Sequence, residues 1–321
     1  MTTKSNSSGQ QIRAHRKLIE GFQFFRMRMQ GLASQEAEGH RYIDAIEGYQ
    51  RTYEQFSGRD QPLRRVLEIG YGARPLRLIA MQSMGWDVRG IDLDRPILKG
   101  TLAEFATVLR TNGLDRCLKS FIRHTLFDRS ERAALGRALR ARGYQYRIEP
   151  GRFLVGNAAE LQAAGGDFDL IVSEDVFEHI PPDDLDRVIG NMARLLNPQG
   201  VAIVQPCIFT GITGGHFFEW YPHLVDASIK RRSKPWDHLR NNEFPVNCYL
   251  NRLTRSDFHA LLTRHFVIVE ETVKYPGLGR QHLTPAVRAE LAAYSEDELL
   301  SNNVRYVLRL PAASQSRRAA A

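Results

Sequence analysis

A short apolar run that ends in two closely spaced glycines most constrains how this chain can fold. Residues 65–70 (RVLEIG) predict a buried strand, and residues 76–84 predict the helix that follows it. Gly70 and Gly72 allow a tight turn between the two and let a ligand approach the backbone. Asp92 ends the next predicted strand, 20 residues past Gly72. Its carboxylate suits ribose hydroxyls, so the pattern predicts a site for an adenosine-type cofactor.

Strands and helices continue to alternate along the chain. Further strands are predicted at residues 87–92, 153–157, 168–173, 201–204, 266–270 and 304–309. Helices are predicted at residues 183–196, stopped by NPQG at 197–200, and at residues 258–265, preceded by a capping box over residues 254–257. This alternation is typical of an α/β protein with a parallel sheet and helices on both faces.

The chain divides into three parts. Residues 1–60 are expected to form a helical N-terminal extension, because apolar residues recur at helical spacing over residues 11–56 after a polar start. Residues 61–311 form the predicted main domain, with insertions at 97–151 and 206–253. The Ala/Ser/Arg-rich residues 312–321 are expected to be a disordered tail.

Composition excludes several classes of protein. Hydrophobic residues make up 43% and charged residues 25% of the 321 residues, which is typical of soluble globular proteins. No apolar run approaches the length of a membrane helix, the polar start lacks the apolar core of a secretion signal, and three scattered cysteines form no disulfide or zinc pattern. We therefore expect a cytoplasmic protein without membrane contact.

The positive charge of the chain is concentrated. The net charge is +8, and residues 101–155 hold eleven basic against five acidic residues. Leu and Phe at helical spacing in this segment predict an amphipathic lid with its arginines outward. An anionic acceptor and RNA are both compatible with such a segment.

Two residues beside the glycine turn distinguish between cofactors. A dinucleotide site requires a third glycine for close helix packing, where this chain has Pro75. Glu68 stands directly before the turn, and its carboxylate would repel a pyrophosphate. A cationic ligand with an amino group, such as S-adenosylmethionine, fits better, so a nicotinamide-dependent oxidoreductase is disfavoured.

Five segments of residues 64–205 resemble class I S-adenosylmethionine-dependent methyltransferases, in that family's order. They are VLEIGYG (66–72), GIDLD (90–94), GNAAEL (156–161), the stretch from FDLIVS to EHI (168–180) and LLNPQG (195–200). The resemblance implies a Rossmann-like sheet of six parallel strands and a seventh antiparallel strand inserted near the end, a place that residues 304–310 fit. The chain departs from the pattern at Pro75, at Asn157 in place of Asp, and at Gln199 in place of Gly.

The same resemblance implies S-adenosyl-L-methionine as cofactor and assigns the residues that hold it. These are Glu68, Gly70, Gly72, Asp92, Asn157, Ala158 and Ser173. Methyl transfer is an in-line displacement. The enzyme must align nucleophile and sulfonium, exclude water and accept a proton where needed.

A cluster of acids and histidines follows two of the predicted strands. Asp175, Glu178 and His179 would share a face if the chain makes a helical turn there, and His216 follows the next strand at the same sheet edge. This D-x-x-E-H…H arrangement resembles the metal site of small-RNA 2′-O-methyltransferases, and its first part also resembles quinone-biosynthesis O-methyltransferases. The resemblance implies that Asp175, Glu178, His179 and His216 bind a divalent metal, Mg²⁺ or Mn²⁺. Without a metal, the pair Glu178-His179 would cap the turn and border the acceptor pocket, and His179 or His216 could serve as catalytic base.

The second insertion contributes a basic run at residues 230–236 (KRRSKPW) and the aromatic residues Trp220, Tyr221, Trp236 and Tyr249. The basic run could bind phosphate or carboxylate, and the rings could stack on a planar or sugar ring. A solvated loop over core aromatics explains the same pattern equally well.

These observations predict an enzyme that methylates a hydroxyl of a small-molecule or glycan-type acceptor, with an anionic acceptor as one candidate. Metal-assisted 2′-O-methylation of RNA is one alternative, although no recognisable RNA-binding module is present. A non-catalytic adenosine-binding scaffold is the other.

Overall fold

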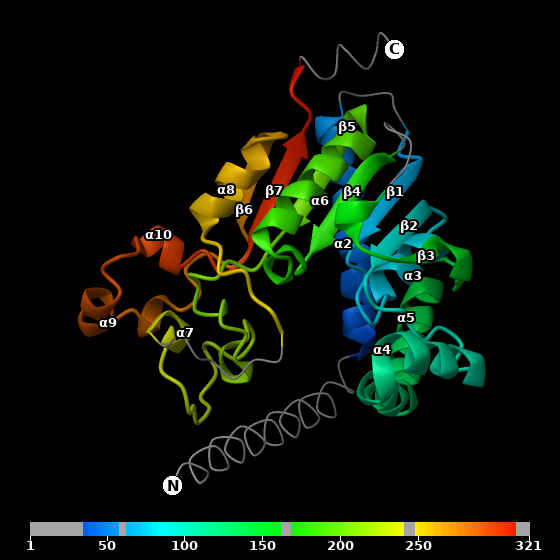
Figure 1. Cartoon of the computed structure of the whole chain (residues 1–321), viewed down its shortest axis with the longest axis horizontal. Helices are drawn as coiled ribbons and strands as arrows, with labels where there is room; N and C mark the ends of the chain where they lie inside the picture. The colour runs from blue at the N-terminus through cyan, green and yellow to red at the C-terminus, as the bar shows by residue number, and fades with distance from the viewer. Residues whose placement is uncertain (1–34, 58–61, 162–167, 241–247, 313–321) are drawn as a thin grey trace, which may run out of the picture.

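The computed structural model describes residues 35–57, 62–161, 168–240 and 248–312, which form a layered α/β fold (Figure 1). Its sheet has seven strands in the order β3-β2-β1-β4-β5-β7-β6. They are β1 (Arg65–Ile69), β2 (Asp87–Asp92), β3 (Phe153–Val155), β4 (Phe168–Glu174), β5 (Leu196–Gln205), β6 (Val267–Val273) and β7 (Val304–Arg309). Only β7 runs antiparallel to its neighbours, β5 and β6. The predicted Rossmann-like fold, with its seventh strand inserted antiparallel, is confirmed.

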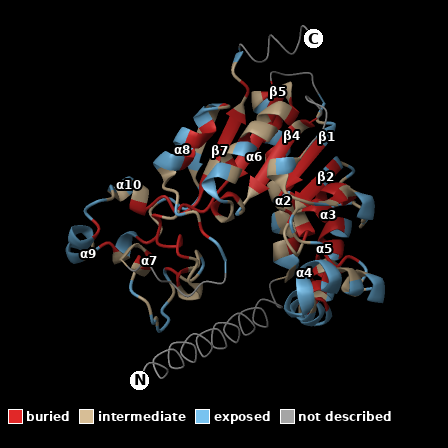
Figure 2. Cartoon of the chain, in the orientation of Figure 1, coloured by how far each residue is buried: buried red, intermediate tan, exposed pale blue. Residues whose placement is uncertain are grey.

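The central strands are apolar on both faces, because helices cover both. Val66, Leu170 and Val172 join a core with α2 (Gln35–Phe56), α3 (Leu76–Ser83) and α5 (Arg129–Ala141). Leu67 and Ile171 join the opposite core, with α6 (Pro182–Leu195) and α8 (Arg255–Thr263). Figure 2 shows this buried sheet between its helix layers. The alternation fixes the register, since a shift by one residue would exchange the two faces.

The described part of the N-terminal extension is one helix, α2. It buries Ile43, Ile46, Tyr49 and Tyr53 against α3 and α5, following the apolar spacing of the sequence. The helix expected over residues 11–34 lies outside the described residues.

The first insertion contains α4 (Leu102–Arg123), the π-helical turn η2 (His124–Asp128) and α5. A capping box between Thr101 and Glu104 starts α4, and Gly113, with φ 82°, interrupts it. The predicted amphipathic pattern, with arginines outward, is found in α5, which buries Leu135 and Leu139 and exposes Arg137 and Arg140, but it is not found in α4. Apolar side chains of α4 and η2 face solvent, at Leu102, Leu109, Leu114, Leu118, Phe121, Ile122 and Leu126. Several arginines of the insertion lie at the surface and form ion pairs there, for example Arg116 with Asp94 and Arg137 with Glu36.

Strand β5 begins five residues earlier than predicted. Asn197, Pro198, Gln199 and Gly200 belong to it, although the sequence pattern marks them as a stop. An irregular register between Phe168 and Leu170 of β4 accommodates Pro198. Gly200 is required there, because a Cβ would lie 2.9 Å from the carbonyl oxygen of Asp169.

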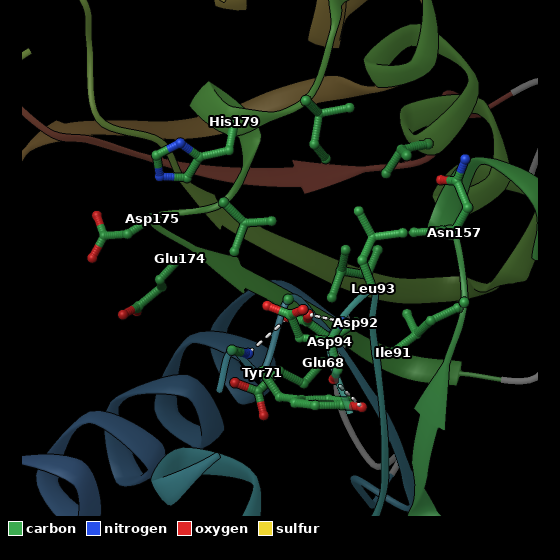
Figure 3. Close-up of a pocket in the computed structure, with 18 of the residues that line it drawn as sticks. Glu68, Tyr71, Ile91, Asp92, Leu93, Asp94, Asn157, Glu174, Asp175 and His179 are labelled. Atoms are coloured by element: carbon green, nitrogen blue, oxygen red, sulfur yellow. Dashed lines mark hydrogen bonds between the residues drawn. The ribbon is translucent and has the colours of Figure 1, made fainter. Parts of the chain in front are cut away.

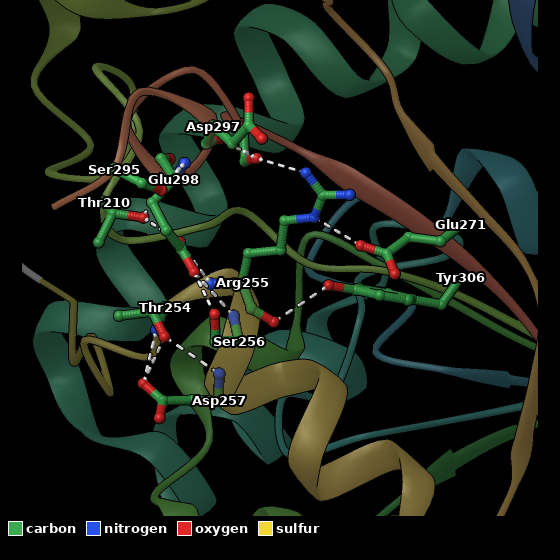
Figure 4. A network of polar contacts seen from close by, with 11 residues as sticks. Thr210, Thr254, Arg255, Ser256, Asp257, Glu271, Ser295, Asp297, Glu298 and Tyr306 are labelled. Carbon is green, nitrogen blue, oxygen red and sulfur yellow. Dashed lines mark hydrogen bonds and ion pairs between the residues drawn. The ribbon is translucent and has the colours of Figure 1, made fainter.

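The second insertion is attached to the sheet through a polar network (Figure 4). Thr254 and Asp257 form the predicted capping box of α8. Glu298, in the short helix α10 (Glu296–Leu299), accepts hydrogen bonds from Thr210 and from the backbone of Arg255. Arg255 reaches β6 through Glu271, at 2.5 Å. The network therefore joins segments that lie far apart in sequence.

A third apolar core supports the insertion. Trp220 and Trp236 are fully buried there, with Leu283, Leu291 and Leu299 from the chain around α9 (Pro285–Glu290) and α10. In the described part of the chain, no helix is both long and apolar enough to span a membrane.

Candidate active site

A cavity of about 680 Å³ opens at the carboxyl ends of β1, β2 and β4 (Figure 3). This is the sheet edge where open α/β folds bind ligands, and the volume is in the range of small-molecule sites. Of the residues predicted to hold the cofactor, six line the cavity: Glu68, Gly70, Gly72, Asp92, Asn157 and Ala158. The seventh, Ser173, does not. Its buried hydroxyl donates to the carbonyl of Ile69, so Ser173 joins β4 to the end of β1.

The glycine turn forms the base of the cavity. Gly70 has φ 78°, and a Cβ there would lie 2.2 Å from the side chain of Val176. Gly72 has φ 66°, and its N–H donates to Asp92 Oδ2 at 2.8 Å. The N–H of Asp94 donates to Asp92 Oδ1 at 2.8 Å. Asp92 thus connects β2 to the turn and presents a carboxylate to the cavity.

An ion-pair network lies behind the turn. Arg77 Nε lies 2.7 Å from Glu68 Oε1, and its NH1 lies 2.7 Å from Glu174 Oε2. Tyr49 of α2 donates to Glu174 Oε1 at 2.5 Å. Burial raises the pKa of Glu68 despite Arg77, and Glu68 Oε2 has no hydrogen-bond partner. For Glu174, the positive charges of Arg77 and Lys274 outweigh burial and lower the pKa.

This network was not predicted from the sequence. The sequence did contain one signal, because Arg77 is the single charged residue in the predicted helix that became α3. In the structure only 14% of its side chain is exposed. Glu68 was expected to meet the cationic end of the cofactor directly. In the structure one of its oxygens is held by Arg77, which leaves Oε2 for a ligand.

Asn157 caps the short turn η4 (Ala158–Glu160) at the opposite end of the cavity. Its Oδ1 accepts a hydrogen bond from the N–H of Ala159 at 2.9 Å. The amide therefore offers Nδ2 as a donor to a ligand. The carbonyls of Ala158 and Ala159 accept hydrogen bonds from Asn191 of α6, which fixes this turn.

His179 borders the cavity at the end of β4. Its Nδ1 lies 2.9 Å from the carbonyl oxygen of Tyr249. Because a carbonyl only accepts, Nδ1 carries the proton and the lone pair of the neutral ring lies on Nε2. That Nε2 is 4.0 Å from Glu178 Oε1. A lone pair so placed can accept a proton.

His216 lies beside His179 rather than in the wall of the cavity. The two rings meet edge to face, with centroids 5.1 Å apart. Burial, with the nearby His179 and His238, lowers the pKa of His216 to about 4. Its φ of 52° is unusual for a residue other than glycine, and such strain often marks a functional position.

The residues predicted to bind metal are only partly brought together. Asp175, with φ 55°, precedes the 3₁₀ turn η5 (Phe177–His179), so no α-helical turn places it beside Glu178 and His179. Its Oδ1 accepts a hydrogen bond from Asn303 Nδ2 at 2.9 Å. Among described residues, two groups have potential ligand atoms within 4.8 Å of one another: Glu178 with Cys207 and His216, and His179 with His216 and Cys248. Asp175 is in neither group. The set carried over by resemblance therefore does not fit a Mg²⁺ or Mn²⁺ ion as predicted.

The aromatic and basic residues of the second insertion serve mainly in its structure. Trp220 and Trp236 are buried and cannot stack on a ligand. Arg231 lies over the Trp220 ring at 4.5 Å and donates to the carbonyls of Leu224 and Val225. Tyr249 alone among the four predicted rings lines the cavity.

Comparison with known proteins identifies the family. Residues 40–264 match the family described as "Methyltransferase domain". This chain belongs to that methyltransferase family. It is a class I methyltransferase that uses S-adenosylmethionine, as the five segments indicated. The non-catalytic scaffold is accordingly set aside.

Solved structures are similar to this chain at low identity. One is a protein of Pyrococcus horikoshii, 14% identical, with a TM-score of 0.43, covering 84% of this chain and 91% of that one. Another is a TehB-like methyltransferase of Corynebacterium glutamicum, 16% identical, with a TM-score of 0.39 and coverage of 89% and 96%. A third is the geranyl diphosphate C-methyltransferase of Streptomyces coelicolor, 13% identical, with a TM-score of 0.41 and coverage of 81% and 74%. No curated protein matches the sequence.

Proposed function

We propose that this methyltransferase transfers a methyl group to a hydroxyl of a small-molecule or glycan-type acceptor, with His179 as general base. The hydrogen bond from His179 Nδ1 to the Tyr249 carbonyl carries the proposal, because it leaves a lone pair on Nε2 at the edge of the cavity. A hydroxyl is a weak nucleophile and gains from a base as its oxygen attacks the methyl carbon. The hydroxyl proton would pass to Nε2, and S-adenosylhomocysteine would leave as a neutral thioether.

The cofactor would lie across the residues of the glycine turn and η4. The Asp92 carboxylate would accept hydrogen bonds from the ribose, and Asn157 Nδ2 and the backbone at Ala158 would face the adenine. The free oxygen of Glu68 would face the ammonium group, which matches its position behind Gly70. This orientation directs the sulfonium toward His179.

The surroundings of His179 support an uncharged, hydroxyl-bearing acceptor. Tyr249, which is 52% exposed, and Ile180 offer a flat and apolar surface of the kind that sugar and aromatic rings contact. The carboxylates of Asp175 and Asp184 also line the cavity. The arginines of the cavity are engaged by acids, as in the pairs Arg74–Glu131 and Arg116–Asp94. An anionic acceptor is therefore the weaker alternative.

Ion pairing of the arginines also disfavours RNA as the acceptor. Six arginines of the basic first insertion form ion pairs with acids of the fold or of the insertion: Arg116, Arg123, Arg137, Arg142, Arg147 and Arg152. Pairing reduces the charge that phosphates would meet.

The test is a transfer assay with labelled S-adenosylmethionine against panels of alcohols and glycosides, phenols, amines and short RNAs. We expect label in hydroxyl compounds, released with the mass of a methyl ether. Transfer confined to amines, carbon acids or RNA would overturn the proposal.

A further inference from the structure

The disagreement at the predicted metal site points to a different ligand set. Asp175 is held by Asn303, whereas Cys207, directly beyond β5, approaches Glu178 and His216. We propose that Glu178, Cys207 and His216 form a binding site for a thiophilic transition-metal ion of the zinc type. The proposal does not depend on the acceptor being a hydroxyl, because its test detects the ion itself.

The three ligands are arranged closely enough for one ion. Their ligand atoms all lie within 4.8 Å of one another, and zinc–ligand bonds of about 2.0–2.3 Å would draw them together by small side-chain rotations. Glu178 comes from the turn η5, and Cys207 and His216 come from two positions of the second insertion. The backbone of Cys207 is fixed by bridging to Asn303, and the N–H of His216 donates to the Thr213 carbonyl at 3.0 Å. The ligands are thus held by ordered backbone.

An unpartnered buried carboxylate is the second observation. Glu178 is 3% exposed, and neither of its carboxylate oxygens makes a well-formed hydrogen bond, although the backbone N–H groups of Glu178 and Cys207 lie close enough to stabilise its charged form in part. Burying a carboxylate without a charged partner costs free energy, and a bound cation would offset that cost. Within the described chain no arginine or lysine pairs with Glu178.

The charges balance around a divalent ion. Glu178 and a Cys207 thiolate would supply two negative charges, and the His216 imidazole would bind as a neutral ligand through a ring nitrogen. Burial raises the pKa of the Cys207 thiol, and a bound metal ion would displace its proton. Thiolate and imidazole ligands favour zinc over Mg²⁺ or Mn²⁺, which prefer oxygen. Three protein ligands would leave one position open.

The second group, His179 with His216 and Cys248, is the weaker site. His179 already uses Nδ1 for the Tyr249 carbonyl, and Cys248 is exposed. It also contains no unpartnered buried acid. An ion on Glu178, Cys207 and His216 leaves His179 Nε2 available as a base.

Cobalt substitution distinguishes the two groups. The full chain, stripped with chelator, is titrated with Co²⁺, and bound zinc is measured separately by elemental analysis after dialysis. We expect about one zinc per chain, little retained Mg²⁺ or Mn²⁺, and a thiolate-to-cobalt charge-transfer band in the near ultraviolet. Cys207→Ser should abolish the band, whereas Cys248→Ser and the distant Cys117→Ser should keep it.

Glu178→Gln provides a second variant that removes the charge at nearly constant volume. It should weaken zinc binding at least about tenfold, the low end for loss of a metal-supporting group, and keep the charge-transfer band at saturating Co²⁺. Circular dichroism and S-adenosylmethionine binding verify that each variant is folded. The proposal is overturned if no zinc is retained, if Mg²⁺ or Mn²⁺ binds in preference, or if Cys248→Ser rather than Cys207→Ser removes the band.

Discussion

The carbonyl oxygen of Tyr249 lies 2.9 Å from Nδ1 of His179, although 70 residues separate the two in sequence. The second insertion therefore determines which nitrogen of a residue at the end of β4 is basic. One hydrogen bond thus connects the second insertion to the proposed catalytic base.

Replacing His179 tests this relationship. His179→Gln should lower kcat by about 10²- to 10⁴-fold, the usual contribution of a general base. S-adenosylmethionine affinity, measured by isothermal titration, should stay within about twofold, because His179 contributes no hydrogen bond to the proposed cofactor residues. The exposed His223→Gln is the matched control. A His179→Gln enzyme of normal kcat would show that His179 is not the base.

Asp92 should determine cofactor affinity. Asp92→Ala removes two acceptors of backbone N–H groups, at Gly72 and Asp94, together with the proposed ribose contact. Hydrogen bonds to charged groups contribute about 1.5–3 kcal/mol each, so we expect binding to weaken by at least about 10- to 100-fold in isothermal titration. Asp87→Ala, at the exposed start of the same strand, should bind normally. Equal affinity of the Asp92 and Asp87 variants would contradict the assigned cofactor position.

Arg77 should stabilise the fold more than any surface cation. Arg77→Met leaves the buried Glu68 and Glu174 without their shared counter-ion. Breaking a buried pair by removing one partner costs about 3–5 kcal/mol, which urea unfolding should detect. Arg264→Met removes an exposed pair with Asp186 and should cost at most about 1 kcal/mol. A stability loss no greater than that of Arg264→Met would show that the network contributes little.

The buried, uncharged His238 should make the folded enzyme less stable at acidic pH. Burial is the main cause that lowers its pKa from 6.5 to about 4 in the folded chain, where Nε2 contacts the Phe209 carbonyl. Below pH 6.5 the unfolded chain binds a proton that the folded chain does not, so stability falls with pH down to about 4 and is unaffected above 6.5. At about 1.4 kcal/mol per pH unit, the loss at pH 5 is about 2 kcal/mol.

The check is urea unfolding of wild type and His238→Gln at pH 7.5 and pH 5. His238→Gln should lose about 2 kcal/mol less than wild type between the two pH values. The same drop in both proteins would assign the acid sensitivity to other groups.

Local patterns were sufficient to predict much of the fold. Short apolar runs correctly indicated six of the seven strands to within a few residues, since the central parallel strands are buried on both faces. The start of β5 was missed, because Pro198 and Gly200 are turn residues in most contexts. Here they lie in the irregular stretch between Leu196 and Val201, which pair with β4. The solvent-facing leucines of α4 were missed, since helical spacing does not show which face is covered.

Contacts between distant residues explain what could not be predicted in the site. The expected common face of Asp175, Glu178 and His179 assumed an α-helical turn, and a left-handed residue followed by a 3₁₀ turn replaced it. Cys207 and Cys248 were dismissed as scattered, because spacing in sequence does not show that β5 and the second insertion meet beside η5. Arg77 was missed since one charged residue in an apolar helix does not identify its partners.

The bond between Asn303 and Asp175 has a consequence for the order of synthesis. Asn303 follows Asp175 by 128 residues and lies directly before β7. The strands that carry the glycine turn, Asp92 and Asn157 are complete once residue 174 has left the ribosome. The side of the cavity that contains Asp175 cannot form until nearly the whole polypeptide has emerged and β7 has inserted between β5 and β6. A nascent chain can therefore assemble the cofactor half of its site well before it can assemble the half that meets the acceptor.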